Sequence, residues 1–598
     1  MAFSKFWSRP TTRNVQVHEH SDNSNADLSM IHEGGLSFTV AKGGNGSGPS
    51  YQEAVGAPVE TKSPLGYHVG WVTVLFLNVN QMIGTGVFSS PGTILNRTGS
   101  IGLALIYWAI GVLLAIAGFC VYLELASYFP NRSGSEVVYL EQAFPRPKHF
   151  FPITFAVYSV LLSFSSSNAV VMSNYLWSLG GTTPTDWQVK GVAIAAYTLA
   201  VICVLLHNKF SLWAVNFIGV IKILTLVFIS ITGFVVLGGH VSRVPNPGAN
   251  FHNAFEGTTT NGNDLSVALV NIIFAYTGYQ NAFSVVNEIK NPIPTLKRNG
   301  AISVGVVGVL YMLCNIAYFA AVPKEQFAMS KETAASVFFT AVFGRGGAQK
   351  ALDFLVLLSA FGNLLATLIG QSRLIREIGR QGVLPYTEFW VSTKPFGTPL
   401  GPYFLKWVMT FIMIVAPPAG DAFQFVVSLK TYPDGLFSVA LGIGVWIIRY
   451  HHKRINRGKP EFKTWDIMLV FYLLIQLYVI VTPWIPPKGG PYAGEVSFWY
   501  ATYCVVGIAV IIACGLYYVA WMYVLPRWGH YKLRPEILDV DDDGANTHRL
   551  VKVPLEDLAQ WDKEHDEAGR LRRRHNAGSE GSLKLDINNT TVEPTKKV

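Results

Sequence analysis

Long apolar runs constrain this chain more than any other feature, because they fill most of the sequence between residues 68 and 525. A helix that crosses a bilayer needs about 20 consecutive, mostly apolar residues. We therefore predict an all-α polytopic membrane protein with twelve transmembrane helices. They are expected near residues 70–95, 102–129, 150–177, 188–207, 211–239, 264–286, 299–322, 351–379, 402–418, 421–449, 466–485 and 497–523.

The composition supports a membrane location and argues against nucleic-acid binding. Hydrophobic residues make up 50% of the chain and charged residues 14%, whereas soluble domains carry about 25% charged residues. The net charge of +9 is explained by basic residues that flank membrane spans on the cytoplasmic side. We expect the lipid bilayer as a partner and no nucleic acid.

The loops predict the orientation of the helices. If both termini are cytoplasmic, the inner loops carry about twice as many Lys and Arg residues as the outer loops, which is the bias that cytoplasmic loops show. We predict a multi-pass protein in which an N-terminal tail (1–67) and a C-terminal tail (526–598) lie in the cytoplasm. The two tails flank one helical domain (68–525).

Both predicted tails are polar. The N-terminal tail has no signal-peptide apolar region, so we expect no cleavage for secretion, and we predict that it is disordered. Residues 553–564, VPLEDLAQWDKE, are amphipathic enough to dock as a helix on the inner face. A second interpretation makes the tails regulatory, with lysines such as Lys42 and Lys62 serving a ubiquitin-ligase and arrestin machinery.

The first apolar run contains the stretch NQMIGTGVFSSPG (80–92). A helix interior disfavours Gly by about 1 kcal/mol and Pro by about 3 kcal/mol. Within a membrane, broken helix is tolerated only where it is buried in protein or lines a cavity. The stretch therefore predicts an unwound backbone that forms a binding site; close helix packing through small residues is the alternative.

A second interruption lies in the sixth run, FAYTGYQNAFSVVNEIKNP (274–292). We predict the break at Ala275, Tyr276, Thr277 and Gly278. Matching interruptions in corresponding spans of two halves are the best sequence indication of a secondary transporter with inverted repeats. The two breaks together are stronger support than either glycine-containing stretch alone.

Unwound helices expose the groups that bind a zwitterion. Backbone N–H groups at the start of a half-helix, near Thr85, Gly86 and Val87, favour a carboxylate, and glycine allows its close approach. Freed carbonyl groups near Met82 and Ile83, and near Phe274 and Ala275, would accept from an ammonium group. We therefore predict a site for an α-amino acid near the membrane midplane. Its expected residues are Met82, Ile83, Gly84, Thr85, Gly86, Val87, Phe274, Ala275, Tyr276, Thr277, Gly278 and Asn281.

Several of these side chains have a second explanation. Phe274 is expected as an aromatic lid over the substrate, although aromatic core packing is the common alternative. Asn281, with Ser165, Ser166 and Asn168 of the third run, could add polar contacts in the pocket. Such side chains also form hydrogen bonds between transmembrane helices.

At this point four segments carry a resemblance to a known family. MIGTGVFSSPGTIL (82–95) resembles the first-span signature of amino acid–polyamine–organocation permeases, and FAYTGYQN with NEIKNPIPTLKR (287–298) is similar to their sixth span and the loop after it. YLELASYFPNRSGSEVVYLEQAF (122–144) and GQSRLIREIGRQGVLP (370–385) resemble their second span with its loop and the loop after the eighth span.

Within that superfamily, LNVNQMIGTGVFSSPGTI is most similar to the L-type branch, particularly fungal high-affinity methionine permeases. The resemblance implies a five-plus-five inverted-repeat (LeuT-like) core with discontinuous helices 1 and 6, and two further helices. It implies uptake of L-methionine or a related neutral amino acid across the plasma membrane, with a proton gradient as the energy source and no cofactor. An exchanger of broader neutral specificity and a nutrient sensor that uses the same pocket remain alternatives.

The resemblance also bears on a partner subunit. Animal L-type carriers are joined by a disulfide to a heavy chain through a cysteine in the loop after the third span. Here that loop reads SLGGTTPTDWQVK and holds no cysteine, so we predict no such partner. The chain's five cysteines lie in apolar runs without paired spacing, which favours neither a disulfide framework nor a metal site.

Ionisable residues inside spans are functional candidates. Lys222 in the fifth run matches, by resemblance, a lysine whose ammonium group takes the place of a sodium ion, and it could bridge to the broken first span; a lysine that reaches the interface is the alternative. Glu124 is expected in proton release or in a pair with Arg132, and Glu288 in an inner gate with Lys290. The roles of Asp421, Lys430 and Asp434 in the tenth run stay open.

An enzyme is the remaining class to consider. The chain has no HExxH motif, no phosphate-binding Walker loop, no nucleophile elbow in a strand–turn–helix setting and no cluster of carboxylates or histidines at metal spacing. We therefore predict that it is not an enzyme and binds no metal.

Overall fold

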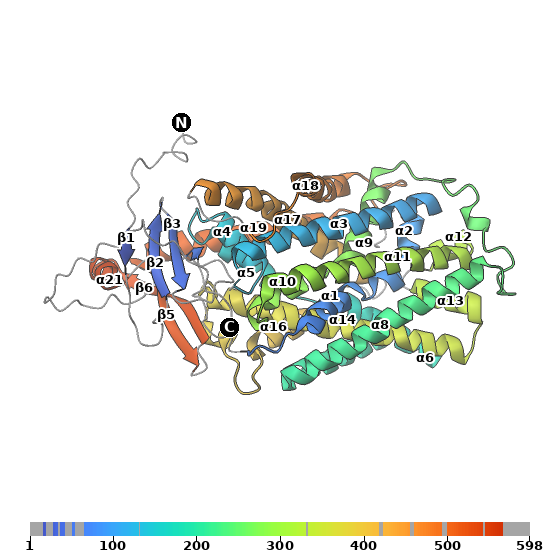
Figure 1. Cartoon of the computed structure of the whole chain (residues 1–598), viewed down its shortest axis with the longest axis horizontal. Coiled ribbons are helices and arrows are strands. Elements are labelled where there is room, and N and C mark those ends of the chain that lie inside the picture. Colours follow the sequence, from blue (N-terminus) through green and yellow to red (C-terminus); the bar gives the residue numbers. More distant parts are fainter. Residues whose placement is uncertain are drawn as a thin grey trace, which may run out of the picture.

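The computed structural model of this chain is an elongated bundle of helices with β-strands at one end (Figure 1). The structure describes residues 16–18, 28–33, 36–41, 51–53, 65–130, 132–330, 333–417, 422–454, 460–492, 499–541 and 545–565. Asp421 and the lysines of the predicted regulatory tail, Lys42 and Lys62, lie outside these residues.

Ten helical segments of the described part are long and apolar enough to cross a membrane, and each coincides with one of the predicted runs. They are Trp71–Thr98, Ile101–Tyr128, Phe150–Gly180, Asp186–Leu206, Asn208–Leu237, Pro292–Ala321, Gly347–Arg380, Phe425–Lys453, Asp466–Trp484 and Thr502–Trp528. The protein is therefore a multi-pass membrane protein.

Some of these segments are single helices and others are built from two or more. In chain order the helices that form them are α1 (Trp71–Met82), α2 (Gly86–Thr98), α3 (Ile101–Tyr128), α5 (Phe150–Leu161), α6 (Ser166–Gly180), α7 (Asp186–Leu206), α8 (Asn208–Leu237), α10 (Pro292–Thr295), α11 (Ala301–Ala321), α14 (Gly347–Arg380), α17 (Ala422–Arg454), α18 (Asp466–Val481), α19 (Thr502–Val519) and α20 (Leu525–Trp528).

The two remaining predicted runs form shorter helices. The sixth run forms α9 (Gly262–Tyr276, 15 residues), which is followed by a turn and a 3-10 helix (Asn281–Glu288). The ninth run forms α16 (Leu400–Val415, 16 residues). Short helices outside the runs are α4 (Glu136–Ala143), α12 (Lys324–Ala328), α13 (Ala334–Phe343), α15 (Thr387–Val391) and α21 (Leu558–Glu564).

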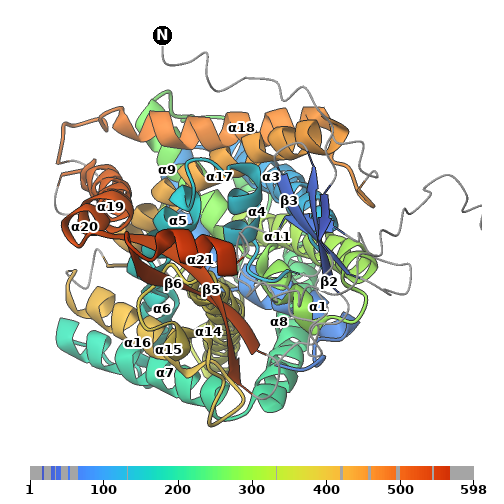
Figure 2. The ribbon, with the colours of Figure 1, turned by 90° about the vertical axis from the view of Figure 1, so that its left-hand side faces the viewer.

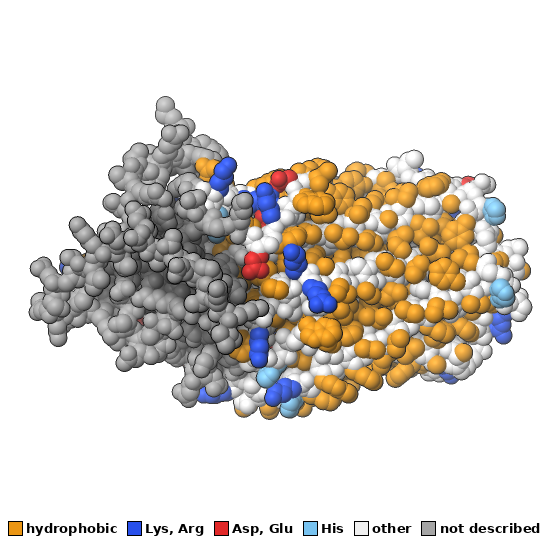
Figure 3. Space-filling view, viewed as in Figure 1, with side chains coloured by type: hydrophobic (Ala, Val, Ile, Leu, Met, Phe, Trp, Pro, Cys, Tyr) orange, Lys and Arg blue, Asp and Glu red, His pale blue; other side chains and the backbone are white. Residues whose placement is uncertain are grey.

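Apolar side chains cover the flank of the bundle (Figure 3). On α8, for example, one face exposes the side chains of Phe210, Trp213, Phe217, Leu224 and Phe228. Lys and Arg side chains gather toward the end that carries the strands, whereas the middle of the visible flank is apolar (Figure 3). A belt of exposed apolar groups of this size is the surface that a lipid bilayer covers.

The third span contains a break that the sequence analysis did not predict. Helix α5 ends at Leu161 and α6 begins at Ser166, so that residues 162–165 are not helical. The segment has neither Gly nor Pro, but it belongs to the serine-rich stretch SFSSSN. Serine side chains can replace helical hydrogen bonds of the backbone, and this composition was the signal that the prediction passed over.

Both tails contain strands among their described residues, whereas the sequence analysis expected a disordered N-terminal tail. Strands β1 (Gln16–His18), β2 (Leu28–Glu33), β3 (Leu36–Ala41) and β4 (Tyr51–Glu53) pair in that order as an antiparallel sheet. Polar and apolar residues alternate along the first five residues of LSFTVA, which is typical of a strand, whereas LSMIHE alternates only in its first three.

The C-terminal tail forms a hairpin of β5 (Tyr531–Asp541) and β6 (Ala545–Pro554). Strand β6 contacts α14 and α15, and Figure 2 shows the hairpin and α21 lying across this end of the bundle. The helix predicted within residues 553–564 is confirmed as α21.

Candidate functional site

The first span is interrupted where the sequence predicts. Helix α1 ends at Met82, helix α2 begins at Gly86, and the residues between them are not helical. The buried Lys222 ammonium donates hydrogen bonds to the carbonyl oxygens of Asn80 (2.8 Å) and Ile83 (2.5 Å). The predicted bridge from the fifth span to the broken first span is therefore present, and the alternative of a lysine that reaches the interface is wrong.

The second interruption begins later than predicted. Phe274, Ala275 and Tyr276 still belong to the last turn of α9, and the non-helical residues are 277–280. Thr277 has extended dihedral angles, and Gly278 has a φ of +135°, which strongly favours glycine. Ala275 and Tyr276 are compatible with a helix and remain part of α9. The helix therefore ends because of Gly278 and not because of these two residues.

The two breaks contact each other through their glycines. A Cβ atom at Gly86 would lie 2.6 Å from the Cα atom of Ala275, and one at Gly278 would lie 2.7 Å from the backbone nitrogen of Met82. Any side chain at either position would therefore collide with the backbone of the other broken helix. The predicted reason for Gly86 was close approach of a substrate carboxylate; in the structure Ala275 occupies that space.

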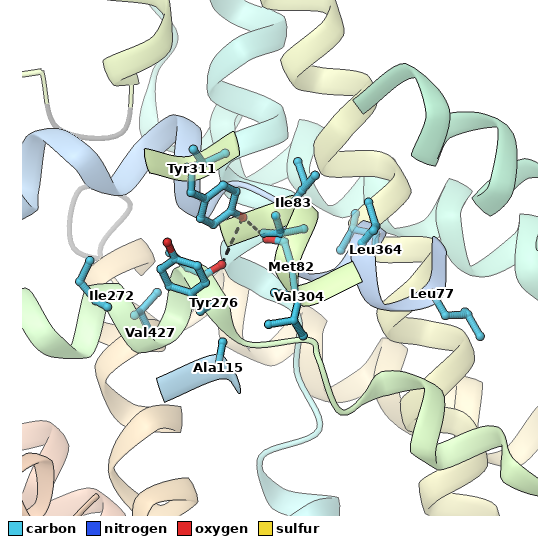
Figure 4. Packing of buried hydrophobic residues seen from close by; sticks show 14 of the residues in the cluster. Leu77, Met82, Ile83, Ala115, Ile272, Tyr276, Val304, Tyr311, Leu364 and Val427 are labelled. Carbon is cyan, nitrogen blue, oxygen red and sulfur yellow. Dashed lines mark hydrogen bonds between the residues drawn. The ribbon is translucent and has the colours of Figure 1, made fainter. Parts of the chain in front are cut away.

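One buried tyrosine connects the two breaks. The Tyr311 hydroxyl of α11 donates to the carbonyl oxygen of Met82 (2.5 Å) and to that of Ala275 (3.2 Å). Figure 4 shows the Tyr311 ring beside Tyr276, with its hydroxyl directed at Met82. A single side chain therefore fixes the carbonyl groups at the ends of α1 and α9.

Replacing Tyr311 with phenylalanine tests this connection. The ring would remain, but both carbonyl groups would lose a donor, and an unsatisfied buried group costs about 1–3 kcal/mol. We expect the initial rate of amino acid uptake to fall about tenfold, which corresponds to about 1.4 kcal/mol. Uptake into proteoliposomes measures the change, with Tyr311→Leu as a variant that loses the ring as well. A wild-type rate in Tyr311→Phe would contradict the role of the hydroxyl.

The start of α2 offers unpaired N–H groups. Among the described residues, the backbone N–H groups of Thr85, Gly86 and Val87 donate no hydrogen bond to a protein acceptor. These buried residues form the first turn of the half-helix, where the helix dipole favours a negative charge. The geometry therefore supports the prediction that this end binds a carboxylate.

Two side-chain amides from neighbouring spans hold this end in place. The Thr85 hydroxyl donates to Asn168 Oδ1 (3.0 Å), and Asn168 Nδ2 donates to Asn363 Oδ1 (3.0 Å). Asn363 Nδ2 donates in turn to the carbonyl oxygen of Gln81 (2.5 Å). Asn168 was expected to contact the substrate and instead positions Thr85, and the sequence analysis missed Asn363 because an asparagine inside an apolar run has no distinguishing pattern.

The carbonyl groups predicted to accept from an ammonium group already have protein donors. Ile83 O accepts from Lys222 and from Ser359 (3.2 Å), and the Met82 and Ala275 oxygens accept from Tyr311. The Phe274 oxygen accepts from the N–H of Thr277 (3.3 Å).

Unpaired acceptors lie one turn further along the chain. Within the described part of the chain, the carbonyl oxygens of Tyr276 and Thr277 receive no donor. These two oxygens, at the point where α9 ends, are better placed to receive a substrate ammonium than the predicted ones.

Asn281 lies just after the second break, and its side chain connects this segment to two other helices. Its buried amide nitrogen donates to the carbonyl oxygens of Leu77 (3.2 Å) and Ala366 (3.0 Å), so it joins the 3-10 helix to α1 and α14. Phe274 remains partly exposed beside the breaks, as a lid over the substrate would be.

The two predicted gate carboxylates pair with arginines that differ from the expected partners. Glu288 Oε1 binds Arg373 Nε (2.9 Å), while Lys290 is exposed. Both Glu124 oxygens bind Arg449 (2.7 Å each), and Thr464 N–H donates to one of them (2.8 Å). The predicted pair of Glu124 with Arg132 is wrong, since spacing along one chain segment cannot reveal a partner 325 residues away.

Arg132 belongs to a separate buried network near the last turn of α14. It contacts Glu141 (3.3 Å) and lies 3.9 Å from Glu377, which also binds Arg380 (2.7 Å). Burial raises the pKa of Glu141 to about 7. The negative charge of Glu377 adds to this rise, and the positive charge of Arg132 opposes it. Together with the Glu288–Arg373 pair, this network joins the loop after the second span to the end of α14.

Comparisons with known proteins agree with this geometry. A family model described as amino acid permease matches residues 69–511. The high-affinity methionine permease of Saccharomyces cerevisiae is 37% identical over 83% of this chain and 86% of its own length. The low-affinity methionine permease of the same yeast is 29% identical (82% and 89% covered). The b(0,+)-type amino acid transporter 1 of Mus musculus is 27% identical (78% and 90% covered).

Proposed function

This chain belongs to the amino acid permease family and is an amino acid transporter, not an enzyme, and on that premise we propose that it takes up L-methionine across the plasma membrane. Transport proceeds by alternating access and is driven by a proton gradient, with both termini in the cytoplasm. The similarity to a methionine permease over most of both chains supports the substrate, and the bias of Lys and Arg toward the inner loops supports the orientation.

The observation that carries this proposal is the meeting of two broken helices. Among the described residues, the buried N–H groups of Thr85, Gly86 and Val87 have no acceptor. In the adjoining break, the carbonyl oxygens of Tyr276 and Thr277 have no donor within the same described part of the chain. The first set suits a carboxylate and the second suits an ammonium group. An α-amino acid carries both groups on one carbon atom.

The finer topology is part of the proposal. We expect twelve transmembrane helices, made of the ten long segments together with the shorter α9 and α16, and a five-plus-five inverted-repeat (LeuT-like) core. The positions of the breaks in the first span and beside α9 support this arrangement, because inverted-repeat transporters bind substrate at two discontinuous helices.

The proposal also covers the energy source and the partners. Lys222 holds the carbonyl oxygens of Asn80 and Ile83, which supports its assignment to the position of a sodium ion and therefore coupling to protons alone. The absence of cysteine between residues 178 and 190 supports transport without a disulfide-linked heavy chain. Ubiquitin-ligase and arrestin partners of the tails remain a hypothesis that rests on tail lysines.

A competition experiment tests the substrate. We expect proteoliposomes that contain the purified protein to accumulate labelled methionine, and unlabelled methionine to compete better than leucine, cysteine, lysine, glutamate or a polyamine. Protein-free liposomes provide the background. Methionine uptake at that background level, or methionine binding without uptake, would contradict the proposal, and binding alone would favour the sensor.

A further inference from the structure

A group of ionisable side chains in the bundle interior has no part in the site described above. Glu136 begins α4, and Lys430 and Asp434 lie one turn apart on α17. The Tyr122 hydroxyl donates to Glu136 Oε1 (2.6 Å), and the Tyr158 hydroxyl donates to Asp434 Oδ1. All three ionisable residues keep some accessible surface, although both tyrosines are buried.

The charges of this group act on one another. Helix α4, which carries Glu136, packs against α17, which carries Lys430 and Asp434. The negative charges of Glu136 and Asp434 repel, and Lys430 attracts Glu136. Lys430 is also repelled by Lys406 of α16, whose ammonium group is held by Ser163 O (3.1 Å), Ser165 Oγ (3.4 Å) and Gln371. The further groups that face Glu136 are Tyr139 of its own helix, Tyr472 of α18 and Tyr279.

Most other interior carboxylates of the described residues pair with an arginine, as Glu141 does with Arg132 and Glu377 with Arg380. Glu124 and Glu288 each pair with an arginine, so protonation would leave a buried guanidinium without its partner. Asp353 accepts hydrogen bonds from Ser336 (3.2 Å), Gln349 (3.2 Å) and Ser178 (3.5 Å). Glu136 and Asp434 are different, because each accepts a hydrogen bond from a tyrosine hydroxyl and neither has a salt bridge among the described residues. Adding one proton relieves the repulsion between their negative charges.

Tyr279 connects this group to the second break. It lies among the non-helical residues 277–280, and its ring packs edge-on against Tyr122 with the centroids 6.0 Å apart. Gly118 makes room for it, because a Cβ atom there would lie 2.2 Å from the Tyr279 hydroxyl oxygen. A substrate that shifts the second break therefore shifts the tyrosine that packs on the Tyr122–Glu136 hydrogen bond.

We propose that Glu136 and Asp434 are the groups that take up and release the coupled proton during transport, and that Lys222 and Glu124 stay in fixed charge states. This inference rests on the proposed proton-coupled uptake. Burial raises the pKa of Glu136 above its ordinary value, while the hydrogen bond from Tyr122 and the charge of Lys430 oppose that rise. Binding of the proton removes one negative charge from the interior. Release of the proton restores that charge when the two carboxylates become accessible to the cytoplasm.

The test separates proton-driven accumulation from exchange. Proteoliposomes containing the full chain, Glu136→Gln or Asp434→Asn are assayed with an inward proton gradient, while a trapped pH dye reports proton entry. They are also assayed at equal pH on both sides with unlabelled methionine inside, where label enters only by exchange. The matched control is Glu325→Gln, an exposed carboxylate of α12.

We expect both variants to lose methionine accumulation and methionine-dependent proton entry about tenfold or more, because a neutral amide cannot carry the proton. Exchange should stay within about threefold of wild type, since it needs the binding site but no net proton movement. Proton-driven accumulation at the wild-type level in either variant would overturn the inference, as would loss of exchange together with accumulation. A wild-type protein without methionine-dependent proton entry would refute the proposed coupling itself.

Discussion

Replacing Gly278 with alanine is expected to abolish amino acid uptake. Its φ of +135° is open to glycine and strained for alanine, and such strain costs about 1–3 kcal/mol. The added Cβ atom would also lie 2.7 Å from Met82 N and 2.8 Å from Gln81 C. These are backbone atoms of the first broken helix, so no side-chain rotation relieves the collision. The two breaks would have to separate, and the carboxylate and ammonium sites with them.

The expected loss is about 100-fold or more in initial rate, which corresponds to roughly 3 kcal/mol. Gly86→Ala should behave in the same way, since its Cβ atom would meet Ala275 Cα at 2.6 Å. The control is Gly305→Ala on α11, where nothing lies within 4 Å of the new atom. Uptake is compared at equal amounts of reconstituted protein. An uptake rate for Gly278→Ala within threefold of the control would show that transport does not depend on the contact between the two breaks.

Replacing Lys222 with alanine is expected to have the second-largest effect. The carbonyl oxygens of Asn80 and Ile83 would lose a charged donor in the interior of the bundle, and each unsatisfied buried group costs about 1–3 kcal/mol. The unwound first span would lose its attachment to α8. We expect uptake to fall about 30-fold or more, which corresponds to roughly 2 kcal/mol.

The matched control is Lys190→Ala at the start of α7. Its ammonium donates to the carbonyl oxygen of Val415 (2.8 Å) and lies over the Trp187 ring, and it is partly exposed. Hydrogen bonds with that exposure can be replaced by water, so uptake should stay near wild type. Equal losses in the two variants would show that Lys222 acts only as a general structural contact.

The sequence predicts the fold well because apolar length is a local property. Each of the ten long segments could be read from its own residues, and so could the break at Ile83, Gly84 and Thr85, where two glycines stand in an apolar run. The second break was placed a few residues early, since Ala275 and Tyr276 are compatible with helix. Glycine is required at position 278 by its φ of +135° and by the contact with Met82.

The partners of the polar side chains could not be predicted, because they come from distant segments. Arg449 reaches Glu124 from α17, and Tyr311 reaches Met82 from α11. The third break was missed for a related reason. The non-helical residues 162–165 are bound by Lys406, whose ammonium group donates to the carbonyl oxygen of Ser163 from more than 240 residues later in the chain. No local glycine or proline marks the position.

The central claim is that this permease is driven by protons and needs no sodium because Lys222 already supplies a fixed positive charge. Two unit charges about 4 Å apart repel by roughly 4 kcal/mol at an effective dielectric constant near 20. A repulsion of that size weakens sodium binding by about three orders of magnitude. We propose that the energy then comes from the proton gradient.

The most direct measurement is the initial rate of methionine uptake into proteoliposomes with an inward proton gradient, in sodium medium, in choline medium and with a protonophore. We expect the same initial rate of methionine uptake in sodium and in choline medium. We expect methionine accumulation to be lost when the protonophore collapses the proton gradient. Uptake that stops when choline replaces sodium, and that continues when the proton gradient is collapsed, would contradict this proposal.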